Sequence, residues 1–277
     1  MLFTVDFSCP TILRYDGMEA AHHPRKGDSL SIFHGACLNI GAFIRQLSPA
    51  QPCVLCGRMS HDGLWCAACD RTLPYLPAAH CPSCALPTPA GEICGHCLRH
   101  PPLFDRATAA FAYAYPLDRL VQAMKYREQL ALVNAFAGKL VQQIDRSRLP
   151  DRVIAMPLHP AKLRERGFNQ SLLLAAATAR SLKIELLPHA CRRVRDTPPQ
   201  SALPFKERKK NVRDAFCCDI DLSGRHVALV DDVLTTGASL NALAAAVKKR
   251  GATEISVWVA ARTLPHAPIR QASRNQM

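Results

Sequence analysis

The 277-residue sequence lacks any long apolar run, and this limits the kinds of protein it can encode. Its apolar stretches, such as Leu172–Ala177, are far shorter than the ~20 residues that a membrane-spanning helix needs. The chain begins with MLFTVDFSCP, which carries an acid and no basic cluster and so differs from a secretory signal peptide. We therefore expect a cytoplasmic protein without a transmembrane segment.

Two common nucleotide-binding patterns are also missing. The sequence has no GxxxxGK[ST] P-loop and no GxGxxG after a predicted strand, which argues against P-loop and dinucleotide-binding enzymes. A receiver domain, which also begins with an acid pair, would need far more chain after Asp231 and Asp232 than remains before Met277. Other chemistry must therefore explain this acid pair.

Cysteine, in contrast, is abundant, with 13 residues. In a chain without a secretion signal, so many cysteines favour metal binding over a disulfide framework. Eight of them form two sets with the same CxxC-x9-CxxC spacing, which indicates an internal duplication. The two sets are Cys53, Cys56, Cys66 and Cys69, and Cys81, Cys84, Cys94 and Cys97.

This spacing predicts two tandem zinc ribbons with one ion each. Each CxxC turn directs two thiolates to one point, and two turns complete the tetrahedral sulfur set of zinc. The alternatives are a cross-braced arrangement, in which the first CxxC turns of the two sets share an ion, and a single occupied site. His61, His80 and His96 are candidate substitute ligands. Since no coordination position stays open, the zinc is expected to be structural and not catalytic.

The charge of the chain is concentrated in its middle. The formal net charge is +13, and residues 98–213 carry 22 basic against 9 acidic side chains. Such an excess favours a polyanionic partner, either a pyrophosphate-bearing substrate or a nucleic acid such as single-stranded DNA. A solvated basic face that only keeps the protein soluble is the alternative.

The stretch 226–239, HVALVDDVLTTGAS, indicates a sugar phosphate site. Its apolar run Val227–Val230 predicts a strand buried on both faces that ends at the acid pair Asp231 and Asp232. A small, hydroxyl-rich segment follows, named here the TTGAS loop: Thr235, Thr236, Gly237, Ala238 and Ser239. A helix with a Ser or Thr cap is then expected to run to Arg250.

Each part of this stretch has a chemical role. Unpaired backbone N–H groups at the start of a helix attract a phosphate, and Gly237 allows a close approach of the backbone. The carboxylates of Asp231 and Asp232 can accept hydrogen bonds from the vicinal hydroxyls of a ribose and share a magnesium ion with it. We therefore expect a ribose 5-phosphate ligand here.

Strands and helices alternate through the second half of the chain. This predicts an α/β fold with a parallel sheet and right-handed crossovers. A strand or hairpin is expected at 104–115, helices at 116–127, 130–144 and 168–182, and further strands at 153–156, 184–187 and 255–260.

Two basic segments flank this sheet. After the strand at 153–156, a loop with several basic and amide side chains can clamp a pyrophosphate; its candidate residues are Lys162, Arg164, Arg166, Gly167, Asn169 and Gln170. The second segment, from Arg192, contains TPPQ and predicts a mobile lid followed by a basic helix to Phe216.

The VDDVLTTGAS motif resembles the phosphoribosyl pyrophosphate (PRPP) motif of type I phosphoribosyltransferases. Together with the cysteine sets, MKYR, PLHPAKLRERGFNQ and RVRDTPPQSAL, it occurs in an order similar to the ComF family, over roughly residues 37–263. The resemblance implies a double zinc ribbon joined to a phosphoribosyltransferase fold, with magnesium-bound PRPP as ligand, and a role in natural competence and DNA uptake. Asp231 and Asp232 are then the catalytic candidates, while Lys125, Arg164 and Arg166 stabilise the departing pyrophosphate.

These observations predict the domain organisation and leave three hypotheses for the function. A loosely packed arm is expected at 1–35, a helix (36–47) with the double zinc ribbon at 36–100, the phosphoribosyltransferase-like domain at 101–265 and a flexible tail at 266–277. The protein could transfer phosphoribosyl to an acceptor that the sequence does not specify. It could instead bind PRPP or a nucleotide and single-stranded DNA without catalysis. The ribbons could also dock a competence helicase or another DNA uptake protein.

Overall fold

The structure is a computed structural model, and it describes residues 50–126, 129, 131–195 and 215–265. All of these residues belong to one structural unit, Arg45–Met277. The predictions for the N-terminal arm, the helix at 36–47, the centre of the lid and the C-terminal tail lie outside the described residues.

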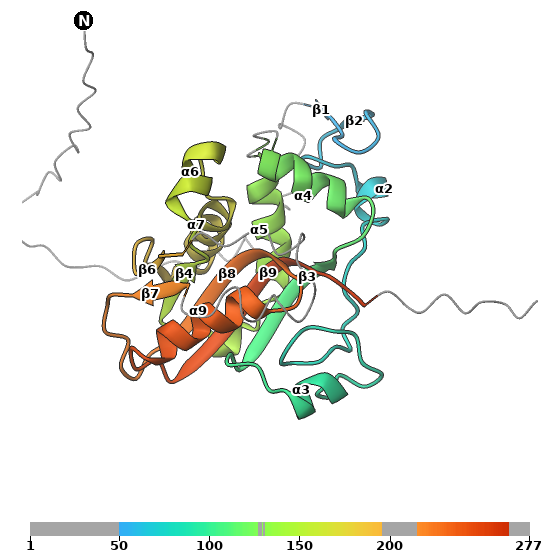
Figure 1. Ribbon diagram of the computed structural model, residues 1–277. Helices are drawn as coiled ribbons and strands as arrows, with labels where there is room; N and C mark the ends of the chain where they lie inside the picture. The colour runs from blue at the N-terminus through green and yellow to red at the C-terminus, as the bar shows by residue number, and fades with distance from the viewer. Residues whose placement is uncertain (1–49, 127–128, 130, 196–214, 266–277) are drawn as a thin grey trace, which may run out of the picture. The chain divides into compact units, whose positions relative to one another are not determined.

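A five-stranded parallel sheet organises these residues and confirms the predicted α/β fold (Figure 1). Its strand order is β3-β9-β8-β4-β5, and every neighbouring pair runs parallel. The strands are β3 (Arg106–Ala112), β4 (Arg152–Ala155), β5 (Glu185–Leu186), β8 (His226–Leu234) and β9 (Glu254–Arg262). The strand with the acid pair, β8, thus has a parallel neighbour on each side.

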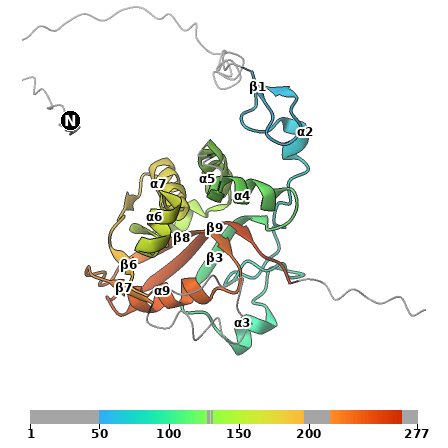
Figure 2. The ribbon, with the colours of Figure 1, turned by 45° about the horizontal axis from the view of Figure 1, so that its top comes forward.

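Helices cover both faces of this sheet, as Figure 2 shows. They are α4 (Leu117–Tyr126), α5 (Ala131–Gln143), α7 (Gln170–Leu182) and α9 (Ala238–Lys248), and a short 3-10 turn, η1 (Arg146–Arg148), follows α5. Because successive strand residues point to opposite faces, Val227 and Leu229 of β8 join the core under α9. Ala228 and Val230 join the core under α4, α5 and α7. This two-sided burial explains the unbroken apolar run of β8.

The amphipathic helix expected after Pro116 is present as α4. Its buried residues are Leu117, Leu120, Val121 and Met124, which share one face of a helix. Among the residues that the structure describes, no helix is both long and apolar enough to cross a membrane.

Three local predictions differ from the structure. The hairpin alternative for 104–115 is wrong, because β3 pairs with the distant strand β9. The expected loop after β4 contains helix α6 (Pro160–Arg166), which ends at Gly167 with a φ of 79°. The basic helix does not extend to Phe216, since that residue begins β7 (Phe216–Cys218), antiparallel to β6 (Cys191–Arg193).

The first zinc ribbon packs against α5. It contains β1 (Gln51–Pro52), β2 (Met59–Ser60) and α2 (Ala67–Asp70). The carboxylate of Asp70 accepts hydrogen bonds of 2.7 Å from Trp65 Nε1 and from the Tyr75 hydroxyl, and lies 2.7 Å from Lys139 Nζ of α5. The ring of Trp65 also contacts that of Phe136, with the ring centroids 6.1 Å apart and the planes tilted by 38°. A polar and an aromatic contact therefore fasten this ribbon to the helix.

The second ribbon, which contains α3 (Gly95–Arg99), lies along the edge strand β3. The backbone N–H of Ala107 donates to the carbonyl of Pro82 at 2.8 Å. Beside it, the segment between the ribbons pairs with the same strand, because Ala112 N donates to Pro74 O at 2.7 Å. The cysteine-rich region thus supplies hydrogen-bond acceptors for some of the backbone N–H groups on the outer edge of β3.

Candidate functional site

The acid pair lies inside β8 and not at its end. The strand continues to Leu234, so the prediction that it stops at Asp231 and Asp232 is wrong. The reason is that β9 keeps pairing past this point, with Asp231 opposite Val259. On the other side, β4 ends its pairing at Val230. Both acids therefore lie beyond the carboxyl end of one neighbouring strand, where open α/β sheets place their ligands.

Two predicted site residues surround the Asp232 carboxylate, which is buried at 4% exposure. Lys125 Nζ, at the end of α4, lies 2.8 Å from Asp232 Oδ2. Gln170 Nε2, at the start of α7, donates to the same oxygen at 3.0 Å. Burial lowers the pKa of Lys125, but the charges of Asp232 and Asp231 outweigh this and raise it above its ordinary value. A buried lysinium–carboxylate pair thus forms the floor of the site.

The Asp231 carboxylate has neutral partners. Its Oδ1 accepts hydrogen bonds from Ser171 Oγ at 2.8 Å and from the backbone N–H of Asp232 at 2.9 Å. Burial, followed by the charge of Asp232, raises the pKa of Asp231 to about 7. Ser171 was not among the predicted site residues, although it follows directly on the predicted Asn169 and Gln170.

Asn169 holds the start of α7 over the end of β4. Its Oδ1 accepts from the backbone N–H groups of Ser171 and Leu172, which makes it the N-cap of the helix. Its Nδ2 donates to the carbonyl of Met156 at 3.0 Å. These bonds fix the position from which Gln170 and Ser171 reach the two acids.

Arg166 continues this network outward. Its Nη1 donates to Gln170 Oε1 at 2.6 Å, and its guanidinium lies 5.1 Å from the ring centroid of Tyr126. Arg164 and Lys162 are on the same short helix, α6; Lys162 pairs with Glu165 at 2.7 Å, and Arg164 is exposed. The structure therefore brings Lys125 and Gln170 to Asp232 and Arg166 to Gln170, whereas Arg164 is exposed.

The TTGAS loop joins β8 to α9, as predicted, but its cap differs. Gly237, with a φ of 79°, is the N-cap of α9, and no side chain caps the helix, so the expected Ser or Thr cap is wrong. Thr236 Oγ1 instead accepts from Ala238 N at 3.4 Å, within the turn. The left-handed backbone at Gly237 favours glycine, and the first N–H groups of α9 have no partner inside the helix.

Arg262, the last residue of β9, was missed by the sequence reasoning. It is buried at 7% exposure, and burial lowers the pKa of its guanidinium. Its Nη1 donates to the carbonyls of Leu234 and Thr263 at 2.8 Å and to that of Thr235, while its Nε donates to Cys84 O at 2.7 Å. The only signal in the sequence was a basic residue two positions after the predicted apolar strand at 255–260.

The cysteine tetrads match the tandem arrangement. The four Sγ atoms of each set lie within 4.8 Å of one another, and the sets are Cys53, Cys56, Cys66 and Cys69, and Cys81, Cys84, Cys94 and Cys97. Four sulfurs at about 2.3 Å from one zinc are about 3.8 Å apart. The observed separations of 3.9 Å between Cys56 and Cys66 and 3.7 Å between Cys84 and Cys94 fit this. The donor sets therefore suit structural zinc, and the cross-braced alternative is wrong.

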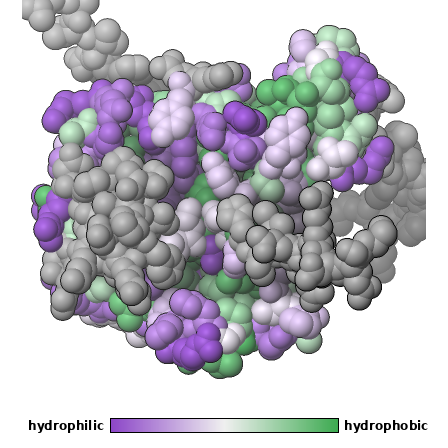
Figure 3. Space-filling view, turned by 45° about the vertical axis from the view of Figure 1, so that its right-hand side comes forward, coloured by the Kyte–Doolittle hydropathy of each residue, from purple (hydrophilic) through white to green (hydrophobic). Residues whose placement is uncertain are grey.

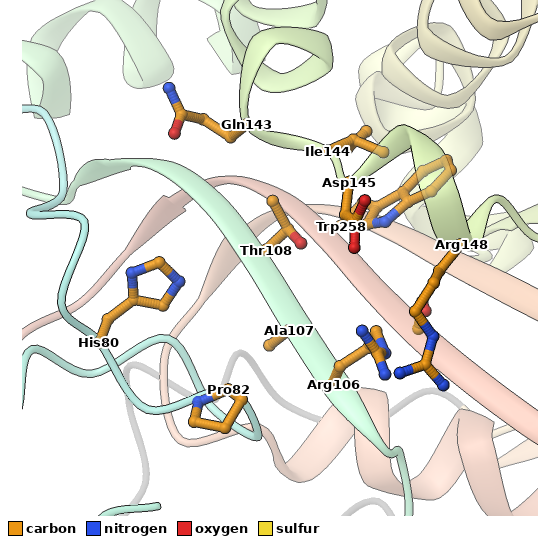
Figure 4. Close-up of a pocket in the computed structure, with 11 residues that line it drawn as sticks. His80, Pro82, Arg106, Ala107, Thr108, Gln143, Ile144, Asp145, Arg148 and Trp258 are labelled. Carbon is orange, nitrogen blue, oxygen red and sulfur yellow. The ribbon is translucent and has the colours of Figure 1, made fainter. Parts of the chain in front are cut away.

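A separate cavity of about 200 Å³ lies at the amino-terminal half of β3 and β9 (Figure 4). Arg106 and Arg148, whose guanidinium groups lie close together in the figure, both pair with Glu254. His80 and Pro82 of the second ribbon line the opposite wall. Of the predicted site residues, the candidate zinc ligand His80 lines this cavity, and the two guanidinium groups are balanced by the carboxylates of Glu254 and Asp145.

The surface of the ribbons carries isolated apolar side chains. Met59 and Leu98 are 62% and 67% exposed. Figure 3 shows hydrophilic and apolar residues next to one another on one face of the molecule. Such exposure is ordinary for a protein surface, so docking of a helicase or another protein on the ribbons stays a prediction.

Comparison with known proteins also divides the chain into a cysteine-rich region and an α/β domain. A double zinc ribbon domain model matches residues 43–98, and a phosphoribosyl transferase domain model matches residues 169–269. The chain is 34% identical over 221 residues to the DNA utilization protein YhgH of Escherichia coli K12, covering 76% of this chain and 97% of that protein. It is also 34% identical to competence protein F of Haemophilus influenzae, covering 76% and 96%. The chain belongs to the ComF family.

The ComF family assignment extends to a more distant relative. Competence protein ComFC of Bacillus subtilis is 25% identical and covers 72% of this chain and 89% of that protein. Among solved structures, a purine phosphoribosyltransferase from Pyrococcus horikoshii is 20% identical over 49% of this chain and 88% of that one, with a TM-score of 0.31. The parallel strand order and the two domain models define the fold.

Proposed function

We propose that this ComF protein binds magnesium-bound PRPP, or another ribose 5-phosphate ligand, and transfers the phosphoribosyl group to an acceptor. One observation carries the proposal. The acid pair of β8, the start of α9 and the cationic and amide side chains of α4, α6 and α7 converge at the carboxyl edge of one sheet. At this edge, Lys125 Nζ lies 2.8 Å and Gln170 Nε2 lies 3.0 Å from the same carboxylate oxygen, Asp232 Oδ2.

The proposed roles follow from the chemistry of each group. The backbone N–H groups of the TTGAS loop bind the 5-phosphate, and the carboxylates of Asp231 and Asp232 accept hydrogen bonds from the ribose hydroxyls. Arg166 and Lys125 stabilise the negative charge that develops on pyrophosphate as its bond to the anomeric carbon breaks. The acceptor then forms the new bond to that carbon.

Magnesium fits this site mainly through Asp231. Carboxylate oxygens are the ligands that magnesium prefers, and Asp231 faces a hydroxyl, whereas Asp232 is already paired with Lys125. When bound, the ion would neutralise part of the pyrophosphate charge. The protein side chains would orient the ribose and hold the ligand at the sheet edge.

The names of the relatives support a biological setting for this activity. They are a DNA utilization protein, competence protein F and competence protein ComFC. We place this chain in the same setting, DNA uptake or the use of imported DNA, with a nucleotide, an amine or a DNA end as the class of acceptor.

Calorimetry with PRPP and magnesium tests the binding step. The double variant Asp231→Asn with Asp232→Asn keeps the side-chain shapes but removes both charges, so we expect at least a tenfold loss of affinity, about 1.4 kcal/mol. Asp221→Asn is a matched control, because Asp221 precedes the amino end of β8, whereas the acid pair lies towards its carboxyl end, and its acceptor role toward Ser223 survives the change. Equal affinity of the double variant and the wild type would refute the site.

Single-turnover assays test the transfer step. Labelled PRPP is offered with a panel of bases, amines and DNA ends, and pyrophosphate release is measured for each. Release that depends on one acceptor class supports a transferase. If the protein binds PRPP tightly but releases no pyrophosphate with any acceptor, it is a PRPP-binding protein and not a transferase.

One observation favours that second candidate, a non-catalytic protein that binds PRPP or a nucleotide together with single-stranded DNA. Tyr126 is 70% exposed at the mouth of the site, with the guanidinium of Arg166 over its ring. An exposed aromatic beside a cation is the kind of surface on which single-stranded bases stack. Salt-sensitive DNA binding that survives loss of both aspartates and falls in Tyr126→Ala would support this function.

A further inference from the structure

The guanidinium of Arg262 connects two parts of the protein that the proposed function treats separately. On one side it binds the carbonyls of Leu234 and Thr235, which lead into the TTGAS loop. On the other side it binds the carbonyl of Cys84, a residue of the second tetrad, at 2.7 Å. We infer that Arg262 is a positioning residue that sets the shape of the TTGAS loop and makes it depend on the second zinc centre.

The burial of Arg262 makes this connection specific. Its exposure is 7%, so water cannot readily replace a partner that moves away. Its geometric hydrogen bonds within the described part of the chain go to four carbonyl oxygens, and the charged groups that favour its cationic form are the thiols of Cys84, Cys94 and Cys97. Four thiolates around one zinc ion carry a net negative charge, so a loaded second tetrad supplies the counter-charge that Arg262 otherwise lacks.

The geometry of the strand end explains how the loop is held. The backbone N–H of Thr263 donates to Leu234 O at 3.0 Å, and Arg262 Nη1 donates to the same carbonyl at 2.8 Å. The carbonyl of Thr235 then points to the same guanidinium, which orients the first peptide of the loop. Because the C=O and the N–H of a trans peptide point in opposite directions, fixing the carbonyl of Thr235 also directs the N–H of Thr236 away from the guanidinium.

The first tetrad has no such connection among the described residues. Its ribbon is fastened to α5 through Asp70 and Lys139, on the other core of the sheet. Removing a ligand from the second tetrad should therefore disturb the TTGAS loop more than removing the equivalent ligand from the first. Cys94 and Cys66 are equivalent, since each donates its backbone N–H to the first sulfur of its own set.

The experiment combines PRPP calorimetry with hydrogen exchange measured by mass spectrometry. Arg262→Lys keeps the charge, but one ammonium group cannot reach Cys84 and the loop carbonyls together. We expect at least tenfold weaker binding of magnesium-bound PRPP and faster amide exchange at 235–239, with exchange in Val227–Val230 unchanged. Arg225→Lys, at an exposed position before β8, is the matched control and should match the wild type.

The zinc arm compares Cys94→Ser with Cys66→Ser, with zinc content measured by native mass spectrometry. Each should lose one ion, but Cys94→Ser should increase exchange at 235–239 and weaken PRPP binding more than Cys66→Ser. Equal effects of the two variants, or wild-type binding and exchange in Arg262→Lys, would overturn the inference. The inference rests on the proposed PRPP site, yet if the wild type bound no PRPP, only the proposed function would fail, because exchange at 235–239 tests Arg262 without a ligand.

Discussion

Lys125 Nζ lies 2.8 Å from Asp232 Oδ2, across the gap between α4 and β8. The pair is largely buried, with side-chain exposures of 22% and 6%. A lysine in this place serves two purposes, since it neutralises a buried acid in the free protein and offers a cation to an incoming pyrophosphate. Ligand binding would then exchange one anionic partner of Lys125 for another.

Replacing Lys125 tests whether this lysine stabilises the folded protein by neutralising Asp232. Lys125→Met removes the cation and keeps much of the side-chain volume, which leaves Asp232 buried with Gln170 as its one side-chain partner among the described residues. We expect a loss of about 2–3 kcal/mol in the free energy of unfolding, measured by chemical denaturation. Adding Asp232→Asn should recover part of that loss, because the uncompensated charge is then gone. Lys248→Met, at an exposed lysine, is the control, and an equal loss there would argue against the pair.

The pKa of Asp231 predicts a pH dependence of ligand binding. Burial and the charge of Asp232 raise that pKa to about 7, so the carboxyl loses its proton near neutral pH. Ribose hydroxyls and magnesium both need the ionised form, so PRPP affinity should rise as the pH goes from 6 to 8. Calorimetry across this range measures the effect. A flat profile in the wild type would show that Asp231 does not touch the ligand.

The same shift predicts a change in stability with pH. Because the folded pKa is above the ordinary 3.8, folded Asp231 retains a proton that the unfolded chain has released, and stability falls as pH rises from about 4 to about 7. Asp231→Asn removes this penalty and can still accept from Ser171. For a pKa raised from 3.8 to about 7, it should therefore be more stable than the wild type at pH 8, by about 4 kcal/mol, with little difference near pH 4. Denaturation curves at both values check this.

Zinc removal should unfold the ribbons without erasing the sheet. We expect native mass spectrometry to find two zinc ions per chain, since the two tetrads have separate and complete donor sets. Chelation should remove both ions and the ordered ribbon structure, because such small modules depend on metal for folding. Far-ultraviolet circular dichroism should retain the signal of the α/β domain. A single tightly bound ion per chain would contradict the tandem arrangement.

Lys139 tests the attachment of the first ribbon. Lys139→Met removes the ion pair with Asp70, whose other donors, Trp65 and Tyr75, remain. Since both charged groups are partly exposed, we expect a cost of about 1 kcal/mol or less. Hydrogen exchange should increase in the first ribbon and stay unchanged in the second. If hydrogen exchange increased equally in both ribbons, the Lys139–Asp70 contact would stabilise the whole molecule and not specifically the attachment of the first ribbon to α5.

The sequence predicted those parts of the site that lie close together along the chain. The acids and the TTGAS loop are nearly contiguous, so their pattern carried both the strand-to-helix turn and the phosphate chemistry. Gln170 was predicted from the basic and amide segment after the strand at 153–156, and Lys125 from the resemblance to phosphoribosyltransferases; the structure places both on Asp232. Ser171 was adjacent to that motif and was overlooked.

Other features depend on partners far away in the sequence. Arg262 and Cys84 are 178 positions apart in the sequence, and no local sequence pattern predicts a contact over such a separation. The extension of β8 past the acids was missed because it depends on the length of β9 and not on the residues of β8. The glycine cap of α9 was missed because the neighbouring hydroxyl residues fit a cap equally well by propensity, while the backbone turn decides which residue takes the position.

The carbonyl of Pro82 and the segment at Pro74 cover backbone groups of β3, an outer strand of the sheet. An uncovered outer strand is a template for pairing with other chains and so promotes aggregation. The cysteine-rich region therefore protects the solubility of the sheet as well as shaping its site. A cell that makes this protein while short of zinc would accumulate it in sedimenting aggregates, even if every residue of the ligand site were intact.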